Sequence, residues 1–311
     1  MVNSSSSRAR RTLVKDPVSE IRRAAFEVRQ ENPQEAVKIL RRCAQEGGEA
    51  EVLARGALGE IYLEDFGDLD GAEHEFRRVL TLAPGLHAAE VGLARTRREA
   101  GDLSEADERF EKAVEGLASD IRAFSQGETP EGAEEVVLSL LEVAIELAEL
   151  RSASAHDSTV SVPFDEDLLR WASAQRLFDS EDDSEDWVRF HALWTQLRLL
   201  TGRAEEALMS LREAEREGRL PPPESARLLS LVFEDLDDAP RAGAEARRML
   251  EATEQPWPLG EVVRAAHLLG DAGKPLLEQA LQHHAPESEE AAALRDALGL
   301  SPLVGLGKPK A

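Results

Sequence analysis

Residues 58–84 read LGEIYLEDFGDLDGAEHEFRRVLTLAP, and residues 93–113, LARTRREAGDLSEADERFEKA, repeat the same pattern. In each stretch, small and apolar residues precede a Gly-Asp turn. An alanine follows, then a phenylalanine four residues later and a small or branched residue three after that. The two alanines, Ala72 and Ala106, lie 34 residues apart. A fixed period of this length predicts a solenoid of stacked helical hairpins, and such arrays usually function in binding.

Weaker copies of the pattern extend the frame in both directions. The spacings between successive anchor residues are 36, 34, 101, 35 and 35 residues, and the long interval is close to three periods. We therefore expect one or two degenerate units in the middle of the chain. In the copy around Ala207, Arg198 occupies a position where the pattern has an aromatic residue. The flanking copies therefore agree with the two clear ones in spacing more than in residue type. These copies are Ala36-Leu40-Cys43, Ala207-Leu211-Ala214, Ala242-Ala246-Met249 and Leu277-Leu281-His284.

The pattern resembles the tetratricopeptide repeat (TPR). The resemblance implies that small residues lie where the two helices of a hairpin cross most closely, and that a phenylalanine fills the wedge between them. It also implies an all-α, right-handed superhelical solenoid of about six or seven helical hairpins with an irregular middle section. The residues that carry it are Gly59, Ala72, Phe76 and Val79 in one copy, and Ala94, Ala106, Phe110 and Ala113 in the next.

Several helix boundaries can be predicted from capping residues. Pro84 cannot continue a helix, so the second helix of the clearest hairpin ends before it. Asp102 can cap the following helix, with Glu105 completing a capping box. Asn32 does the same upstream, with Pro33 in the first helical position and Glu35 closing the box.

The chain divides into five predicted regions. A helix over residues 131–150 with a broad apolar face and a second helix over about 164–178 depart from the repeat pattern in the middle. The polar run 151–163 predicts a Ser-rich loop, and the run 179–186, in which six of eight residues are acidic, predicts a connector. The regions are a disordered basic leader (1–15), N-terminal TPR-like repeats (16–126), an irregular helical middle (127–186), C-terminal TPR-like repeats with a capping helix (187–298) and a flexible tail (299–311).

Charge and composition exclude several classes of function. The 61 acidic and 37 basic residues give a formal net charge of -24, which repels a phosphate backbone and disfavours nucleic-acid binding. No run approaches the roughly 18 to 20 apolar residues of a membrane span, and the N-terminus lacks the apolar core of a secretory signal. We expect a cytoplasmic protein that does not insert into membranes. The basic, serine-containing leader is either a disordered terminus or a tail that docks on an acidic partner.

No constellation of residues predicts catalysis or metal binding. His283 and His284 are adjacent and point in different directions on a helix, so they do not form a two-histidine metal motif. The Gly270–Lys274 turn is too short for a phosphate loop. Cys43, the sole cysteine, takes the position of a small packing residue, and the tryptophans are interpreted as packing residues. We expect no enzyme activity and no cofactor.

The resemblance to TPR proteins also nominates a binding surface, because the first helices of successive hairpins line a concave groove in that family. Gly56 and Glu60 occupy positions where family members that bind a chaperone's C-terminus carry lysine and asparagine, which argues against that binding mode. Arg95 and Arg98 either bind an acidic group of a partner or pair with acids of neighbouring helices. The groove candidates are Leu53, Glu60, Leu63, Val91, Arg95, Arg98, Arg189 and Gln196.

The predicted function is therefore a scaffold or adaptor that binds a partner protein or peptide in the groove. The alternative is a TPR-type chaperone for a secreted or assembling client protein, and an enzyme or RNA-processing factor built on the same repeats is disfavoured by the absence of catalytic motifs and by the charge.

Overall fold

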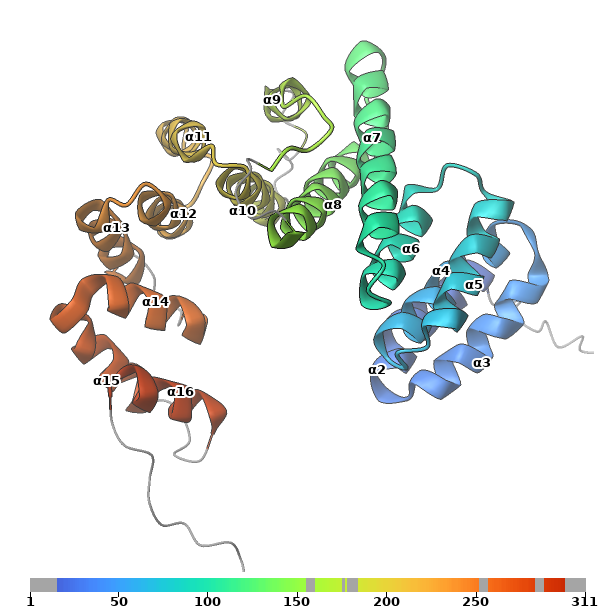
Figure 1. Cartoon of the computed structure of the whole chain (residues 1–311), viewed down its shortest axis with the longest axis horizontal. Helices are drawn as coiled ribbons and strands as arrows, with labels where there is room; N and C mark the ends of the chain where they lie inside the picture. Colours follow the sequence, from blue (N-terminus) through green and yellow to red (C-terminus); the bar gives the residue numbers. More distant parts are fainter. Residues whose placement is uncertain are drawn as a thin grey trace, which may run out of the picture. The chain divides into compact units, whose positions relative to one another are not determined.

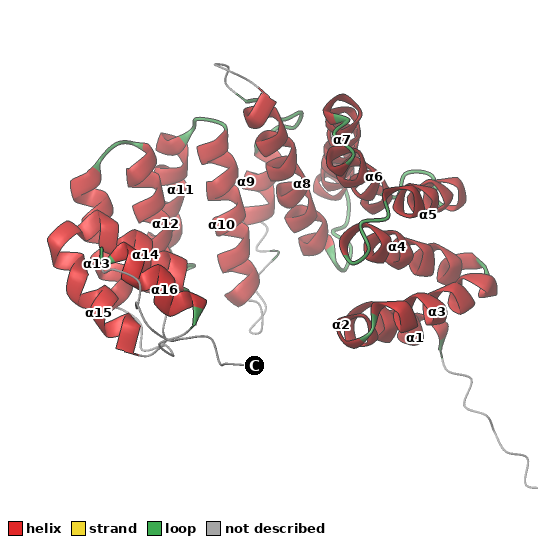
Figure 2. Cartoon of the chain, turned by 60° about the horizontal axis from the view of Figure 1, so that its bottom comes forward, coloured by secondary structure: helices red, strands yellow, loops and turns green. Residues whose placement is uncertain are grey.

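The structure is a computed structural model that describes residues 16–154, 160–174, 177, 184–251, 257–282 and 288–299 (Figure 1). Helices make up all of the regular structure in these residues, and no strand occurs there (Figure 2). They form two compact units, unit 1 (Met1–Pro130 and Val162–Leu168) and unit 2 (Glu131–Ser161 and Leu169–Ala311). The predicted all-α class is confirmed.

Some predicted segments lie outside the described residues. These are the leader 1–15, residues 155–159 of the predicted loop, residues 179–183 of the predicted connector, the pair His283 and His284, and residues 300–311 of the tail. The boundaries of the five predicted regions stay predictions.

Unit 1 consists of three successive helical hairpins. The first helix of the first hairpin runs through α1 (Pro17–Arg23), a π-helical turn (Ala24–Val28) and α2 (Arg29–Glu31), and it pairs with α3 (Pro33–Cys43). A 3₁₀ turn (Ala44–Glu46) leads to the second hairpin, α4 (Gly48–Glu64) and α5 (Leu69–Leu82). The third hairpin is α6 (His87–Glu99) and the long α7 (Leu103–Gln126). Each pair is the antiparallel unit that the repeat predicted.

Phe76 fixes the spacing between the second and third hairpins. It is buried, and its ring lies against two glycines, Gly59 on α4 and Gly92 on α6. A Cβ atom added to Gly59 would lie 2.7 Å from the ring, and one at Gly92 would be closer still. The predicted role of Phe76 as a wedge is confirmed, and the ring also separates its own hairpin from the next one.

The predicted caps Asp102 and Asn32 are present, and Asp68, which was not predicted as a cap, caps α5 in the same way. The Asp68, Asp102 and Asn32 oxygens accept hydrogen bonds from backbone N–H groups three residues later, at 3.0, 3.2 and 3.1 Å. Such caps satisfy donors that have no partner inside the helix. Pro33 takes the first helical position, and α5 ends before Pro84, as predicted.

The predicted return half of the two capping boxes is wrong. The N–H of Asn32 donates to the carbonyl of Val28 at 2.8 Å, and that of Asp102 donates to the preceding helix at 2.9 Å. Because these donors are already satisfied, Glu35 and Glu105 are available for other partners. Each binds a basic side chain of its own helix instead, at 2.9 Å.

Unit 2 begins with two helices that follow no clear repeat, α8 (Ala133–Ser154) and α9 (Asp167–Ala174, in this unit from Leu169). Three hairpins come next: α10 (Ser184–Leu200) with α11 (Ala204–Arg216), α12 (Pro222–Asp235) with α13 (Ala239–Glu251), and α14 (Leu259–Leu269) with α15 (Lys274–Gln282). The 3₁₀ turn Gly270–Gly273 joins the last pair, and α16 (Glu289–Ala297) follows. The predicted turn interpretation of residues 270–274 is thus confirmed.

The middle of the chain differs from its predicted secondary structure in its boundaries. Helix α8 continues to Ser154, past the predicted end at residue 150, and the Ser154 hydroxyl donates back to the Leu150 carbonyl at 2.9 Å. Helix α9 is shorter than the predicted 164–178, and α10 begins at Ser184, inside the predicted connector. Serine at a helix end can satisfy a carbonyl locally, so a polar run does not by itself end a helix.

The anchor residues of the repeat occupy one structural position. Each is the fourth residue of a second helix, and each is buried, because this position faces the first helix of the same hairpin. Ala172 on α9 is also fully buried and lies 35 residues before Ala207, so α8 and α9 take the place of a single degenerate unit. The anchors are Ala36, Ala72, Ala106, Ala207, Ala242 and Leu277.

Candidate functional site

The residues predicted on the first-helix face of unit 1 differ in the surface that they expose. Leu53 on α4 is 40% exposed, whereas Val91 on α6 is only 7% exposed. Glu60 is exposed, and Leu63 is half-buried and packs against the core. Leu53 and Glu60 therefore offer a partner more surface than Val91 does.

Glu60 lies in a cluster of charged side chains from three successive first helices. Arg29 on α2 pairs with Glu64 at 2.6 Å and with Asp65 at 2.5 Å. The Glu60 carboxyl reaches solvent, yet the protein atoms around it desolvate it. This burial is the main reason that its pKa is raised above the ordinary value, and the negative charge of Glu64 adds to it. Arg29 and Arg95 act in the opposite direction without overcoming these effects.

The Glu60 carboxylate forms no hydrogen bond or ion pair with any residue that the structure describes. Its side chain is accessible and its charged form is disfavoured where it stands. A cation placed beside it would lower its pKa and stabilise the charged form. Glu60 is thus an accessible carboxylate suited to a basic group.

The two predicted arginines, Arg95 and Arg98, lie half-buried on α6. The guanidinium carbon of Arg98 lies 5.7 Å from the centre of the Phe110 ring. Between them, Arg97 pairs with acidic residues of α5 and α7. Arg97 thus pairs with neighbouring helices, and both interpretations of Arg95 and Arg98, partner binding and pairing within the array, stay predictions.

The two predicted residues of unit 2 contact α8. Arg189 pairs with Glu142, and Gln196 Nε2 lies 3.4 Å from Glu149 Oε1. From the first pair to the second, both partners advance by seven residues, from Glu142 to Glu149 on α8 and from Arg189 to Gln196 on α10. The two helices therefore run in the same direction, as the first helices of neighbouring repeats do. Arg189 and Gln196 therefore join two first helices in this structure.

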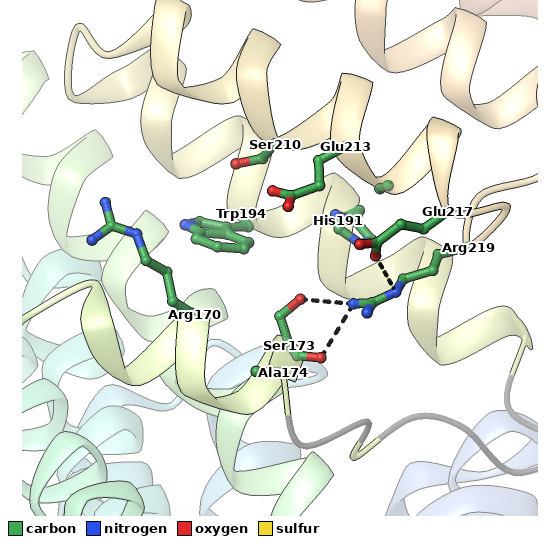
Figure 3. A pocket seen from close by; sticks show the side chains of 10 residues that line it. Arg170, Ser173, Ala174, His191, Trp194, Ser210, Glu213, Glu217 and Arg219 are labelled. Carbon is green, nitrogen blue, oxygen red and sulfur yellow. Dashed lines mark hydrogen bonds and ion pairs between the residues drawn. The ribbon is translucent and has the colours of Figure 1, made fainter.

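A pocket between α9, α10 and α11 was missed from the sequence. It has a volume of about 360 Å³, and Figure 3 shows the side chains that line it. A second part of about 490 Å³ adjoins it through the shared residues Arg170, Ser210 and Glu213. Arg219 closes one end by donating to the carbonyl and hydroxyl of Ser173 at 3.2 and 3.3 Å. We call the two parts together the arginine pocket, because Arg170, Arg198, Arg212, Arg216 and Arg219 line it.

Aromatic side chains of α10 form the floor of this pocket. Trp187 stacks on His191 with ring centroids 5.2 Å apart, and Arg198 lies 4.0 Å above the centre of the Trp194 ring. Burial, with the charges of Arg219 and Arg198 adding to it, lowers the pKa of His191 to about 4, so its imidazole is neutral at pH 7. A cation stacked on an indole explains how an arginine occupies the position where the repeat has an aromatic residue.

Among the described residues, no group of histidine, cysteine and carboxylate side chains is arranged to hold a metal ion. None of the described helices combines the length and apolar character needed to cross a bilayer. Cys43 is buried, and burial is the main reason that the pKa of its thiol is raised, which suits the predicted structural role.

Comparisons with known proteins add little to the chain's own structure. No protein-family model and no curated protein matches it. A tetratricopeptide repeat protein from Parabacteroides merdae ATCC 43184 is similar at 12% identity and a TM-score of 0.48, over 91% of this chain and 97% of that one. An assembly chaperone of RpL4 is similar at 17% identity and a TM-score of 0.37, with the same coverage. The buried anchors, the wedge at Phe76 and the 34- to 36-residue period carry the conclusion instead: the chain has a TPR-like helical repeat fold.

Proposed function

We propose that this protein is a non-enzymatic scaffold or adaptor, and that the first-helix face of unit 1 binds a segment of a partner protein. The surface comprises Leu53, Glu60 and Leu63 on α4 with Arg95 and Arg98 on α6. Val91 supports these side chains from below and contributes little contact of its own, since it is buried.

The state of Glu60 carries this proposal. It is an accessible carboxylate without an ion pair among the described residues, and both burial and the neighbouring Glu64 raise its pKa. A lysine or arginine of the bound segment would relieve this repulsion. The exposed Leu53, two turns before Glu60 on α4, would cover an apolar side chain. Arg95 and Arg98 would contact acidic groups of the same segment, in exchange for their present interactions.

The net charge of -24 supports a protein partner over nucleic acid. It also favours association with basic segments, and it makes that association weaker at high salt. We place the protein in the cytoplasm as part of this proposal, and we propose no cofactor.

Affinity purification with substituted full-length protein tests the proposed surface. We expect Glu60→Gln, and separately Arg95→Ala with Arg98→Ala, to reduce the amount of partner captured. The matched control is Arg77→Ala with Arg122→Ala, which removes two exposed arginines from the second helices α5 and α7. If both double variants capture the same amount of partner, the assignment of this face is refuted.

The chaperone alternative is favoured by one observation, the exposure of large apolar side chains. In unit 1 Phe26 is 67% exposed, and Phe66, Leu86 and Leu103 are exposed as well. A chaperone would cover an unfolded client with such residues, whereas an adaptor would bind folded partners. Hydrogen exchange of the captured protein distinguishes the two: amides that exchange throughout the client support the chaperone, and protected amides support the adaptor.

A further inference from the structure

The arginine pocket is separate from the surface proposed above. It belongs to unit 2. Within unit 2 it also lies on a different face of α10 from Arg189 and Gln196, the predicted groove residues. With about 100° between successive residues, His191, Trp194 and Arg198 lie on the face of α10 opposite to Arg189 and Gln196. The pocket opens toward α9 and α11, and a site there does not depend on the first-helix face.

Two buried polar atoms at the pocket have no partner among the described residues. These are Nε1 of Trp194 and Nε2 of His191, whose side chains are only 5% and 4% exposed. In Figure 3 the indole nitrogen of Trp194 points toward the side on which Arg170 lies. An indole N–H can only donate, and buried polar groups in proteins almost always form hydrogen bonds. A ligand atom with free lone pairs suits this position.

The charges around the pocket favour an anion of low charge density. Of the five arginines that line its two parts, Arg212 pairs with Glu215 and Glu245, and Arg219 pairs with Glu217. Arg198 is buried on the Trp194 ring, so the exposed Arg170 and Arg216 are the arginines that a ligand can reach. The carboxylates of Glu206, Glu213 and Glu217 line the same two parts. Arg170 is accessible and lies 3.9 Å from Glu206, at the boundary of the two parts. The three carboxylates oppose a doubly charged phosphate more strongly than a singly charged carboxylate, whose two oxygens match a guanidinium.

The arginines are also spread out along the pocket. Arg212 and Arg216 lie one turn apart on α11, and Met209, which is 73% exposed, lies on the same part. A single terminal carboxylate would reach only one part. Two acidic side chains on either side of an apolar residue would reach both parts and cover Met209.

We propose that the arginine pocket binds an internal acidic segment of a partner protein. One aspartate or glutamate of the segment is held by Arg170 and the Trp194 N–H, a second is held by Arg216, and an apolar side chain lies on Met209. Neutral His191 forms the floor of the first position and adds no charge to it.

Titration calorimetry on the full chain tests this site with four probes. The first is an N-acetylated, C-amidated hexapeptide containing Asp-Leu-Glu; the second replaces these acids with Asn and Gln. The third has only a free C-terminal carboxylate, and the fourth is inorganic phosphate. We expect the acidic peptide to bind and the other three to bind at least tenfold more weakly.

Two variants assign the binding to the pocket. Arg170→Ala removes an accessible guanidinium, and Trp194→Phe keeps the ring while deleting its N–H. Each should weaken the acidic peptide about tenfold, the effect of losing one hydrogen bond to a charged group. Arg247→Ala, an exposed arginine of α13 outside the pocket, should leave the affinity unchanged. Failure of the acidic peptide to bind, equal binding of the third probe or of phosphate, or equal losses in Arg170→Ala and Arg247→Ala would overturn the proposal.

Discussion

Acidification should destabilise unit 2 through His191, and replacing this residue by phenylalanine should remove the effect. The imidazole is 4% exposed, and its ring lies nearly parallel to that of Trp187, at 18°. The charged groups near it are Arg219 and Arg198, which oppose its protonation, and the carboxylates Glu213 and Glu217 line the same pocket.

The sign and size of the effect follow from the lowered pKa. Burial first, then Arg219 and Arg198, lower the pKa of His191 from 6.5 to about 4. The unfolded chain takes up a proton below pH 6.5, while the folded chain stays neutral down to about pH 4. The stability associated with neutral His191 is therefore complete above pH 6.5 and is lost as the pH falls from 6.5 to 4. A pKa difference of one is worth about 1.4 kcal/mol, so the total loss is about 3 kcal/mol.

Urea unfolding followed by tryptophan fluorescence measures this loss directly. The sequence has four tryptophans, Trp171, Trp187, Trp194 and Trp257, and all of them lie in unit 2. Between pH 7 and 4, the wild type should lose about 3 kcal/mol more than His191→Phe. The larger phenylalanine ring changes the free energy of unfolding by the same amount at every pH, so it does not affect the difference in pH dependence between the two proteins. The same substitution at the exposed His267 controls for the loss of an imidazole. Equal pH dependence in the wild type and His191→Phe would refute the reasoning.

Four further substitutions test the fold and the charge cluster. Gly92→Ala drives a methyl group into the Phe76 ring, and chemical denaturation should show unit 1 destabilised by about 1–3 kcal/mol. Asp68→Ala removes the cap of α5 and should cost about 1 kcal/mol in the same measurement. Arg198→Met deletes a buried cation from the Trp194 ring and should cost about 2 kcal/mol in tryptophan-detected unfolding. Glu60→Gln should raise stability at pH 7 and lose this advantage in acid, because the raised pKa makes the charged form unfavourable in the folded state; a stability loss at pH 7 would contradict it.

The hairpins of unit 1 were predictable because their sequence signals are local. A Gly-Asp turn, the Asp102 cap, the buried Ala72 and the contact of Phe76 with Gly59 all act within one repeat, and the structure uses each as expected. The return hydrogen bonds of the predicted capping boxes do not form, because other local partners are available. Glu35 has Lys38 one turn away, and an ion pair on the helix surface competes with a backbone donor that the preceding helix already satisfies.

The irregular middle was harder to predict because its one repeat, formed by α8 and α9, lacks the Gly-Asp turn of the two clear copies. The interval between Ala106 and Ala207 is close to three periods, which leaves room for two additional repeats, but its described residues form only one. Helix α7 takes 24 residues and α8 takes 22, so longer helices use up the extra length. The spacing between anchor residues gives only the number of residues between them, so it does not distinguish longer helices from an additional helix.

The arginine pocket could not be derived from repeat positions, because its walls come from two successive repeats of unit 2. Arg219 reaches Ser173 across 46 residues of sequence, a contact between two repeats that the pattern within one repeat does not predict. One local signal did exist. Arg198 replaces an expected aromatic residue one turn after Trp194, and a cation four residues from an indole on one helix face can stack on it.

The two proposed surfaces have opposite chemistry, and this makes them separable by experiment. The unit 1 face offers Glu60 to a basic group, and the arginine pocket offers Arg170 to an acidic one. They share no residue and belong to different units. Effects of substitutions at sites without shared partners usually add. Glu60→Gln should therefore leave the affinity for the acidic peptide unchanged, and Arg170→Ala should leave capture through unit 1 unchanged. Loss of both activities in either single variant would mean that one partner spans both surfaces, and the two sites would then have to be treated as one.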